Sequence, residues 1–503
     1  MKPVLANLGF ILQIAGLLTI LPILAAFYYN EPTVLIPFFI TAMTFLCGGF
    51  LLNALAERKT LDLKSSCILI SITFVFLGLI GAIPYIYINA FNDASLLQRL
   101  TNGFFESISG YTTTGFSFFL DPGSLPKSLL LYRSLTELIG GVGIIFILLS
   151  FFYPNKALES FAKVVGVEDI NGNLKKIFAA VMAVYSFFIV SFFLLFYVFG
   201  FKDVVATVTF IIDTLTGGFQ PSMDVLIHRY LTVPVKYFIL LLMFIGSVNF
   251  VFHYRMFTFK FRKALTAEVL TYLGVIVAAT VVIALSGIGL FDSLFHVISM
   301  SSETGYDYLN IPKLNDTVKS VFLLLMILGP CSFSMGGGIR MQRVVLFFKS
   351  IGIGIKKLLG REVDIEFEDE ELNSTEIIYN LLSILLFVGV TFIAATIFST
   401  TGTSFFDSLF EVSSAISTNG FSTGATNIFL PLQFKWLMIA LMIFGRVEMI
   451  PFLVSFYSYP SRQAGRGDAV SVEAAGEQSK TSSSFRKKVQ TETQTKSKKP
   501  PVA

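Results

Sequence analysis

The chain has 503 residues, of which 54% are hydrophobic and 14% charged, and its mean hydropathy is +0.74. This balance excludes an ordinary soluble domain and indicates a membrane protein. The net charge of +4 is small for this length and gives no sign of a nucleic-acid partner. The three cysteines lie far apart with no CxxC spacing, so neither a disulfide framework nor a metal site is expected.

Ten stretches are apolar enough to cross the hydrocarbon layer, which takes about 20 helical residues. They lie near residues 5–29, 33–55, 67–89, 127–152, 175–200, 232–256, 267–290, 317–349, 375–399 and 431–457. Semi-polar stretches between them, such as Leu97 to Tyr111 and Asp407 to Ser417, are too short to span and are predicted to be re-entrant. We therefore predict an all-α polytopic protein embedded in the lipid bilayer.

Basic residues occur in alternate connections between these stretches. Examples are Arg255, Lys260 and Arg262 in one connection and Arg340 and Arg343 in another. The positive-inside rule then places those connections and both termini in the cytoplasm of a multi-pass protein of the cell membrane. The semi-polar stretches would accordingly enter the membrane from outside.

Four short motifs each combine polar residues, a glycine and an aromatic residue. They are Thr112 to Phe116, Leu215 to Phe219, Ser302 to Tyr306 and Ser417 to Phe421. Their glycines, Gly115, Gly218, Gly305 and Gly420, are 103, 87 and 115 residues apart, which leaves room each time for two spanning helices. The spacing predicts four repeats, each with an outer helix, a short pore helix and an inner helix, around a single pore.

The similarity extends upstream of the motifs. Asp292 and Asp407 lie thirteen residues before their glycines, Asn102 holds that position in the first repeat, and Val205 holds it in the second. Asp and Asn are favoured helix N-caps, so three of these positions predict the start of a pore helix. The cap of the second pore helix is left open.

The four motifs have the composition of an ion filter. A short helix that points its C-terminus inward stabilises a cation there, and a glycine just beyond it can turn its carbonyl toward an axis. Four such strands would form rings of carbonyl oxygens that replace the hydration shell of potassium. A single motif of this kind is more often a helix-packing glycine, but four in corresponding places favour the filter. The candidate filter residues are Thr113, Thr114, Gly115, Thr216, Gly217, Gly218, Glu303, Thr304, Gly305, Thr418, Asn419 and Gly420, with potassium contacts expected at Thr114, Gly115, Gly217, Gly218, Thr304, Gly305, Asn419 and Gly420.

Two further features suggest a gate. Pro330 and the run Gly336, Gly337 and Gly338 should interrupt the eighth stretch, and irregular backbone at that depth must line a cavity or pack in protein. A simple packing kink is the alternative. Arg446 lies near mid-bilayer, where facing lipid would cost several kcal/mol, so it should face the pore or pair with an acid such as Glu448 or Glu137.

Glu106, His296 and Glu411 share the position nine residues before the filter glycine, and Thr209 is the fourth member. Hydrogen bonding behind the filter is favoured over direct ion binding for these residues. Asp213 fits the same role.

These motifs resemble the Trk/Ktr/HKT superfamily of potassium transporters, most closely its Trk-type membrane subunit. The resemblance covers about residues 5–458 and rests on Phe105 to Ser107, Thr112 to Gly115, Arg133 to Leu135, Gly140 to Gly143, Thr216 to Phe219, Gly336 to Arg340 and Gly445 to Glu448. It implies potassium as the transported ion, no organic cofactor, a potassium-selective filter at Gly115, a gate loop around Gly336 and Arg446 beneath the filter. It also implies a homodimer with a cytoplasmic nucleotide-binding regulatory subunit, encoded as a separate polypeptide.

The chain departs from the family pattern at three residues. Glu303 stands where threonine is more usual, Glu137 where glutamine is usual, and Asn419 precedes the fourth glycine. The expected division is a two-helix hairpin (1–60), four pore repeats (61–158, 159–262, 263–371 with the gate loop, and 372–458) and a disordered cytoplasmic tail (459–503).

Three alternatives remain open. The first is potassium symport coupled to sodium or protons. The second is a secondary transporter of unrelated fold, although such proteins are often built from two inverted halves. The third, an intramembrane enzyme, finds no support, because the sequence has no HExxH motif and no cluster of carboxylates or of His and Cys residues in the spans.

Overall fold

The computed structural model describes residues 2–55, 61, 63–119, 121–151, 174–221, 225–232, 234–360, 366–367, 370–371 and 374–456. The predicted tail, residues 459–503, lies outside this range. The helices are α1 (Lys2–Leu18), α2 (Ile20–Tyr28), α3 (Pro32–Ala54), α4 (Leu63–Gly81), α5 (Ile83–Tyr87), α6 (Leu96–Tyr111), α7 (Lys127–Phe151), α9 (Leu174–Val198), α10 (Val204–Thr216), α12 (Val235–Ser247), α13 (Phe250–Phe257), α14 (Phe261–Ala264), α15 (Ala267–Leu285), α16 (Leu290–Ser302), α17 (Asp316–Leu328), α18 (Met341–Leu358), α19 (Ser374–Ser399), α20 (Phe405–Ser417), α21 (Leu432–Val447) and α22 (Met449–Phe456).

Short elements complete the described chain. Turns of 3-10 helix lie at Pro122–Ser124 and Ile311–Lys313, and a π-helical turn lies at Leu226–Tyr230. The only described strands, β1 (Glu366–Phe367) and β2 (Glu370–Glu371), pair antiparallel. The predicted all-α class is confirmed.

The ten predicted spans all fall on helices. Within the described residues, six helical segments are long and apolar enough to cross a membrane, and two bent pairs bring the number to as many as eight. The bent pairs are α12 with α13, at 112°, and α21 with α22, at 100°. The other two predicted spans coincide with α7 and with α17 and α18, between which residues 329–340 form an irregular loop.

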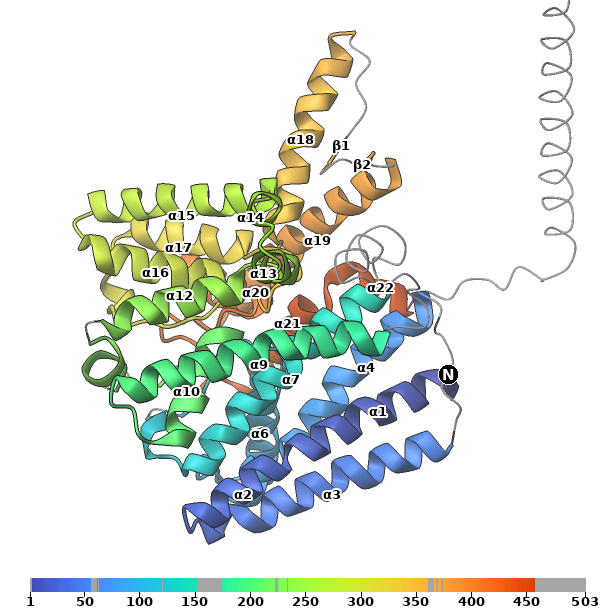
Figure 1. Cartoon of the computed structure of the whole chain (residues 1–503), viewed down its shortest axis with the longest axis vertical. Helices are drawn as coiled ribbons and strands as arrows, with labels where there is room; N and C mark the ends of the chain where they lie inside the picture. The colour runs from blue at the N-terminus through green and yellow to red at the C-terminus, as the bar shows by residue number, and fades with distance from the viewer. Residues whose placement is uncertain are drawn as a thin grey trace, which may run out of the picture. The chain divides into compact units, whose positions relative to one another are not determined.

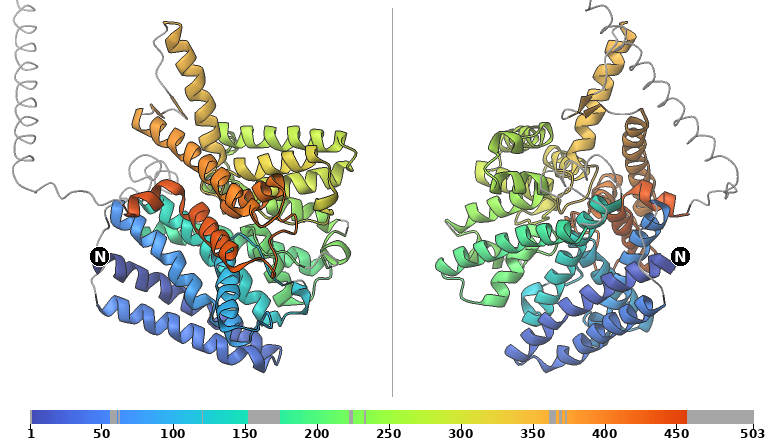
Figure 2. Two further views of the ribbon diagram at one scale, coloured as in Figure 1. Left: turned by 180° about the vertical axis from the view of Figure 1, so that it is seen from behind. Right: turned by 45° about the vertical axis from the view of Figure 1, so that its right-hand side comes forward.

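The helices pack in a pattern that recurs four times (Figures 1 and 2). Each short helix packs against the long helix that precedes it, in the pairs α4 and α6, α9 and α10, α15 and α16, and α19 and α20. Each also contacts the last helix of another unit: α7 packs on α10, α12 on α16, α17 on α20 and α21 on α6. The last of these contacts joins the C-terminal unit back to the first, so the four units close into a ring.

The N-terminal helices pack outside the first unit (Figure 1). α1 contacts α3 and α4, and α2 contacts α7. Glu31, between α2 and α3, accepts a hydrogen bond of 2.8 Å from the backbone N–H of Lys127 and another of 3.1 Å from that of Ser128. These two N–H groups belong to the first turn of α7, which has no helical acceptors for them, so the carboxylate ties the hairpin to the helix.

The predicted pore-helix caps are wrong in position. Asn102 lies inside α6, and Asp292 and Asp407 lie in the first turns of α16 and α20. The capping side chain of α6 is Ser95, and that of α20 is Ser404, which accepts from the N–H of Asp407 at 3.1 Å. An acid in the first turn is favoured by the helix dipole as well, so composition alone does not separate it from a cap.

The second pore helix, whose cap the sequence analysis left open, is capped by Asp203. Asp203, two residues before Val205, accepts from the N–H of Ala206 at 3.1 Å. Partial burial acts to raise the pKa of Asp203, but hydrogen bonds from Lys127 and Tyr29 outweigh it and lower the pKa overall. Burial and the hydrogen bond to Asp203 raise the pKa of Tyr29 to about 12.

Candidate functional site

The four predicted motifs directly follow the C-terminal ends of α6, α10, α16 and α20. Their glycines have positive φ angles: 80° at Gly115, 141° at Gly218, 72° at Gly305 and 79° at Gly420. In three motifs the residue two positions earlier also has a positive φ, namely Thr113 at 55°, Glu303 at 62° and Thr418 at 61°. The second motif differs, because its second positive φ, 74°, is at Gly217, directly before Gly218. In the first, third and fourth motifs, alternation between positive and negative φ turns successive carbonyls toward one side, unlike an extended strand.

Each filter strand closely approaches the next. A Cβ placed on Gly115 would overlap the backbone of Gly218, and one on Gly217 would overlap the carbonyl of Glu303. In the same way, a Cβ on Gly305 would overlap the carbonyl of Asn419, and one on Gly420 the carbonyl of Thr114. The strands therefore neighbour one another in the order one, two, three, four and back to one. At these positions glycine is required both by its φ angle and by the space available.

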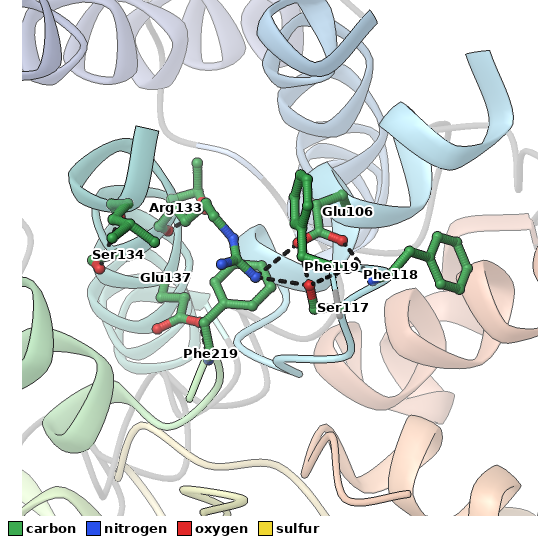
Figure 3. Close-up of polar contacts among 10 residues, drawn as sticks. Glu106, Ser117, Phe118, Phe119, Arg133, Ser134, Glu137 and Phe219 are labelled. Carbon is green, nitrogen blue, oxygen red and sulfur yellow. Dashed lines mark hydrogen bonds and ion pairs between the residues drawn. The ribbon is translucent and has the colours of Figure 1, made fainter. Parts of the chain in front are cut away.

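Glu106 supports the first strand from behind (Figure 3). Its carboxylate accepts from the Ser117 hydroxyl at 2.9 Å, from the Phe118 N–H at 3.2 Å and from the Arg133 guanidinium at 2.8 Å. Arg133 in turn stacks over the ring of Phe219, 3.8 Å from its centroid, in the second unit. One buried ion pair thus fixes two neighbouring strands.

The equivalent residues act alike in two other units. Glu411 accepts from the Thr423 N–H and the Ser422 hydroxyl, both at 2.7 Å, and Nε2 of His296 accepts from the Tyr308 N–H at 3.4 Å. In all three units an acceptor nine residues before the glycine thus binds the N–H three residues after it. The predicted role behind the filter agrees with these contacts. The fourth member, Thr209, has a buried hydroxyl with no partner among the described residues.

Glu137 and Asp213 lie behind the second strand. Glu137 accepts from the Phe219 N–H and, at 3.2 Å, from the Thr216 hydroxyl, and its side chain is hydrogen-bonded to that of Asp213. A Cβ on Gly218 would overlap the Glu137 carboxylate. This acid therefore fills the space that the filter glycine leaves open.

The loop of residues 329–340 lies against the inner ends of the strands. The Thr113 hydroxyl is 3.5 Å from the carbonyl oxygen of Met335, and the N–H of Gly337 donates to the Glu303 carboxylate. Arg446 donates to the Met335 carbonyl at 2.7 Å and to the Gly140 carbonyl at 3.1 Å. The structure thus brings together the two features that the sequence suggested as a gate, the glycine run and Arg446.

Arg446 does not pair with either acid that the sequence offered. Within the described residues Arg446 donates to the backbone carbonyls of Met335 and Gly140, while Glu448 pairs with Arg340 at 3.3 Å and with Arg343. Both residues are buried. Glu448 lies at the break between α21 and α22, and its two ion pairs join this break to the start of α18.

The sequence analysis did not identify Glu268, which lies in α15 and binds the loop of residues 329–340. Its carboxylate accepts from the N–H groups of Ser332, at 2.6 Å, and Gln342, at 3.1 Å, and from the Asn249 side chain at 3.0 Å. It therefore anchors both ends of the loop. In the sequence Glu268 is an acid in the first turn of an apolar helix, which is a common N-terminal feature with no further signal.

Comparison with known proteins agrees with this arrangement. The family of TrkH, described as a cation transport protein, matches residues 265–465. An uncharacterised cation transporter of Methanocaldococcus jannaschii is 28% identical over 90% of this chain and 94% of its own length. The Trk system potassium uptake protein TrkG of Escherichia coli is 25% identical over 90% of this chain and 96% of its own length. These similarities support the Trk-type superfamily for this chain.

A solved structure extends the likeness to the fold. The potassium transporter TrkH of Vibrio parahaemolyticus superposes with a TM-score of 0.77 at 19% identity, covering 91% of this chain and 98% of its own. The chain is therefore a multi-pass membrane protein that is similar to cation transporters. The closed ring of strands and the interrupted eighth span are observed in this chain itself.

The buried pair of Glu106 and Arg133 gives a stability prediction for the Trk-type fold. Arg133→Met should lower the free energy of unfolding by about 3–5 kcal/mol, because it leaves a buried carboxylate without its cation. The double variant Glu106→Gln/Arg133→Met should recover much of that loss. Thermal denaturation in detergent measures both.

A matched control is Lys319→Met, which removes a longer contact of 3.8 Å with the partly exposed Asp407 and should cost about 1 kcal/mol or less. Equal destabilisation by Arg133→Met and Lys319→Met would contradict the assigned importance of the buried pair.

Proposed function

We propose that the chain conducts potassium across the cell membrane through the ring formed by the four glycine strands. The observation that carries the proposal is the closed ring itself, in which four strands, each with a positive-φ glycine, contact one another in sequence order. Carbonyl oxygens arranged in this way can replace the hydration shell of potassium. The predicted potassium contacts at Thr114, Gly115, Gly217, Gly218, Thr304, Gly305, Asn419 and Gly420 belong to this proposal.

The C-terminal ends of the pore helices support the proposed potassium pathway. α6, α10, α16 and α20 each end at the filter, so their partial negative charges face the ring. The carboxylates of Glu106, Glu137 and Glu411 accept backbone N–H groups behind the strands. These contacts hold the strands in place, which a filter of fixed geometry requires.

The loop and Arg446 would gate this pathway. The loop contacts the inner ends of the first, third and fourth strands, and the arginine charge nearby opposes the passage of cations. The relative from Escherichia coli is named as part of a Trk system, which is consistent with further components. A homodimer, a nucleotide-binding cytoplasmic subunit and cytoplasmic termini remain part of the proposal, as do the repeat boundaries.

Flux in reconstituted vesicles tests the function. With an outward potassium gradient, the vesicles should accumulate radioactive rubidium, and external potassium should compete far better than sodium. Uptake that requires a sodium or proton gradient would indicate coupled symport. Equal competition by sodium and potassium would contradict a potassium filter.

A further inference from the structure

Glu303 differs from the other residues at its filter position. Thr113, Thr216 and Thr418 carry hydroxyl groups there, whereas Glu303 carries a carboxylate that is 1% exposed. Its backbone belongs to the third strand. Its side chain extends into the loop of residues 329–340.

The loop is shaped around this carboxylate. The N–H of Gly337 donates to Oε2 of Glu303, and a Cβ on Gly329, Gly336 or Gly338 would lie 3.2, 2.8 or 2.9 Å from its carboxylate oxygens. The Thr418 hydroxyl is 3.5 Å away, and Oε1 has no hydrogen-bond partner among the described residues. Three of the loop glycines thus leave the room that Glu303 occupies.

Arg446 binds the same segment of the loop through a backbone carbonyl instead of an amide. It donates to the Met335 carbonyl at 2.7 Å, two residues before the N–H that Glu303 accepts. We call Ser334 to Gly337 the loop tip. Its backbone is thus held by the Glu303 carboxyl group through an amide and by the Arg446 guanidinium through a carbonyl.

The base of the loop is attached independently of Glu303. Glu268 accepts from Ser332 and Gln342, and the N–H of Cys331 donates to the Ser247 carbonyl at 3.0 Å. The tip could therefore move while the base stays in place. Glu303 and Arg446 are the charged side chains bonded to the tip within the described residues.

We propose that Glu303 is a positioning residue that couples the third filter strand to the loop tip and keeps the tip seated beneath the filter. A purely supporting role would direct its carboxylate to N–H groups on the outer side of its own strand, as Glu106 and Glu411 do. Its bonded oxygen accepts from the loop instead. The inference rests on the proposed transport function and adds a specific restraint on the proposed gate.

The test compares Glu303→Thr and Glu303→Gln in the full chain and in a chain lacking the loop tip, by rubidium flux in vesicles without any partner protein. In the full chain, Glu303→Thr should raise basal flux about tenfold, the order expected for loss of one charge-assisted hydrogen bond. Glu303→Gln keeps an acceptor and should have a smaller effect. In the chain without the tip, both substitutions should change flux by less than about twofold, because the effects of substitutions at coupled residues are not additive.

Asp316→Asn is the matched control, because it removes one exposed carboxylate from the same repeat and should leave basal flux unchanged. An unchanged flux in full-chain Glu303→Thr, or an equal effect with and without the tip, would overturn the coupling. If Glu303→Thr does not reach the membrane, the comparison between the two backgrounds is made with the nearly isosteric Glu303→Gln. If the unmodified chain shows no preference for potassium over sodium, the proposed function is overturned instead.

Discussion

Replacing Gly115 by serine is expected to lower the preference for potassium over sodium about tenfold or more. Gly115 has a φ of 80°, and a Cβ there would overlap the backbone of Gly218 in the next strand. A side chain in left-handed geometry costs about 1–2 kcal/mol, and the overlap adds to it. The strand must therefore shift, which displaces carbonyls on both sides of the first contact in the ring.

Relative rubidium and sodium fluxes in vesicles measure this effect. Gly389→Ser is a matched control, since Gly389 lies within α19, has no positive φ and has open space where a Cβ would stand. An unchanged flux ratio in folded Gly115→Ser protein would show that Gly115 is not part of the filter.

Deleting the loop tip, Ser334 to Gly337, is expected to raise basal flux by an order of magnitude or more while leaving selectivity nearly intact. The deletion removes the acceptor of the Arg446 hydrogen bond and the donor to Glu303, and such charge-assisted bonds contribute about 1.5–3 kcal/mol each. The four strands keep their own supports behind the filter, so their carbonyl rings should persist.

Potassium uptake in a transport-deficient host, with and without the proposed regulatory subunit, measures the effect of this deletion. The shortened chain should depend less on that subunit than the full chain does. Dependence equal to that of the full chain would show that the loop is not the gate. A fall in selectivity alongside the rise in flux would show instead that the tip supports the filter.

The sequence predicted the parts of the site that depend on local constraints. The four glycines could be found because each combines a recurring motif with a conformation that other residues resist. The interruption of the eighth span could be found because Pro330 and three consecutive glycines disfavour a helix, and α17 and α18 do end and begin on either side of it.

Contacts between distant segments could not be predicted in the same way. Glu303 belongs to a filter motif, but its carboxylate binds Gly337, and Glu268 anchors a loop that begins about sixty residues later. The acids offered as partners for Arg446 were wrong because backbone carbonyls at the helix breaks and in the loop are equally good acceptors, and sequence does not show which are free. The pore-helix caps were misplaced for a related reason, since Asp is favoured both at the cap and in the first turn.

The most direct test of the account is the position of rubidium in crystals of the protein, located by its anomalous scattering. We expect rubidium on the axis enclosed by Gly115, Gly218, Gly305 and Gly420, within coordination distance of carbonyl oxygens from all four strands. Rubidium bound elsewhere in the protein, with none inside this ring, would contradict the assignment of the four strands as the ion pathway.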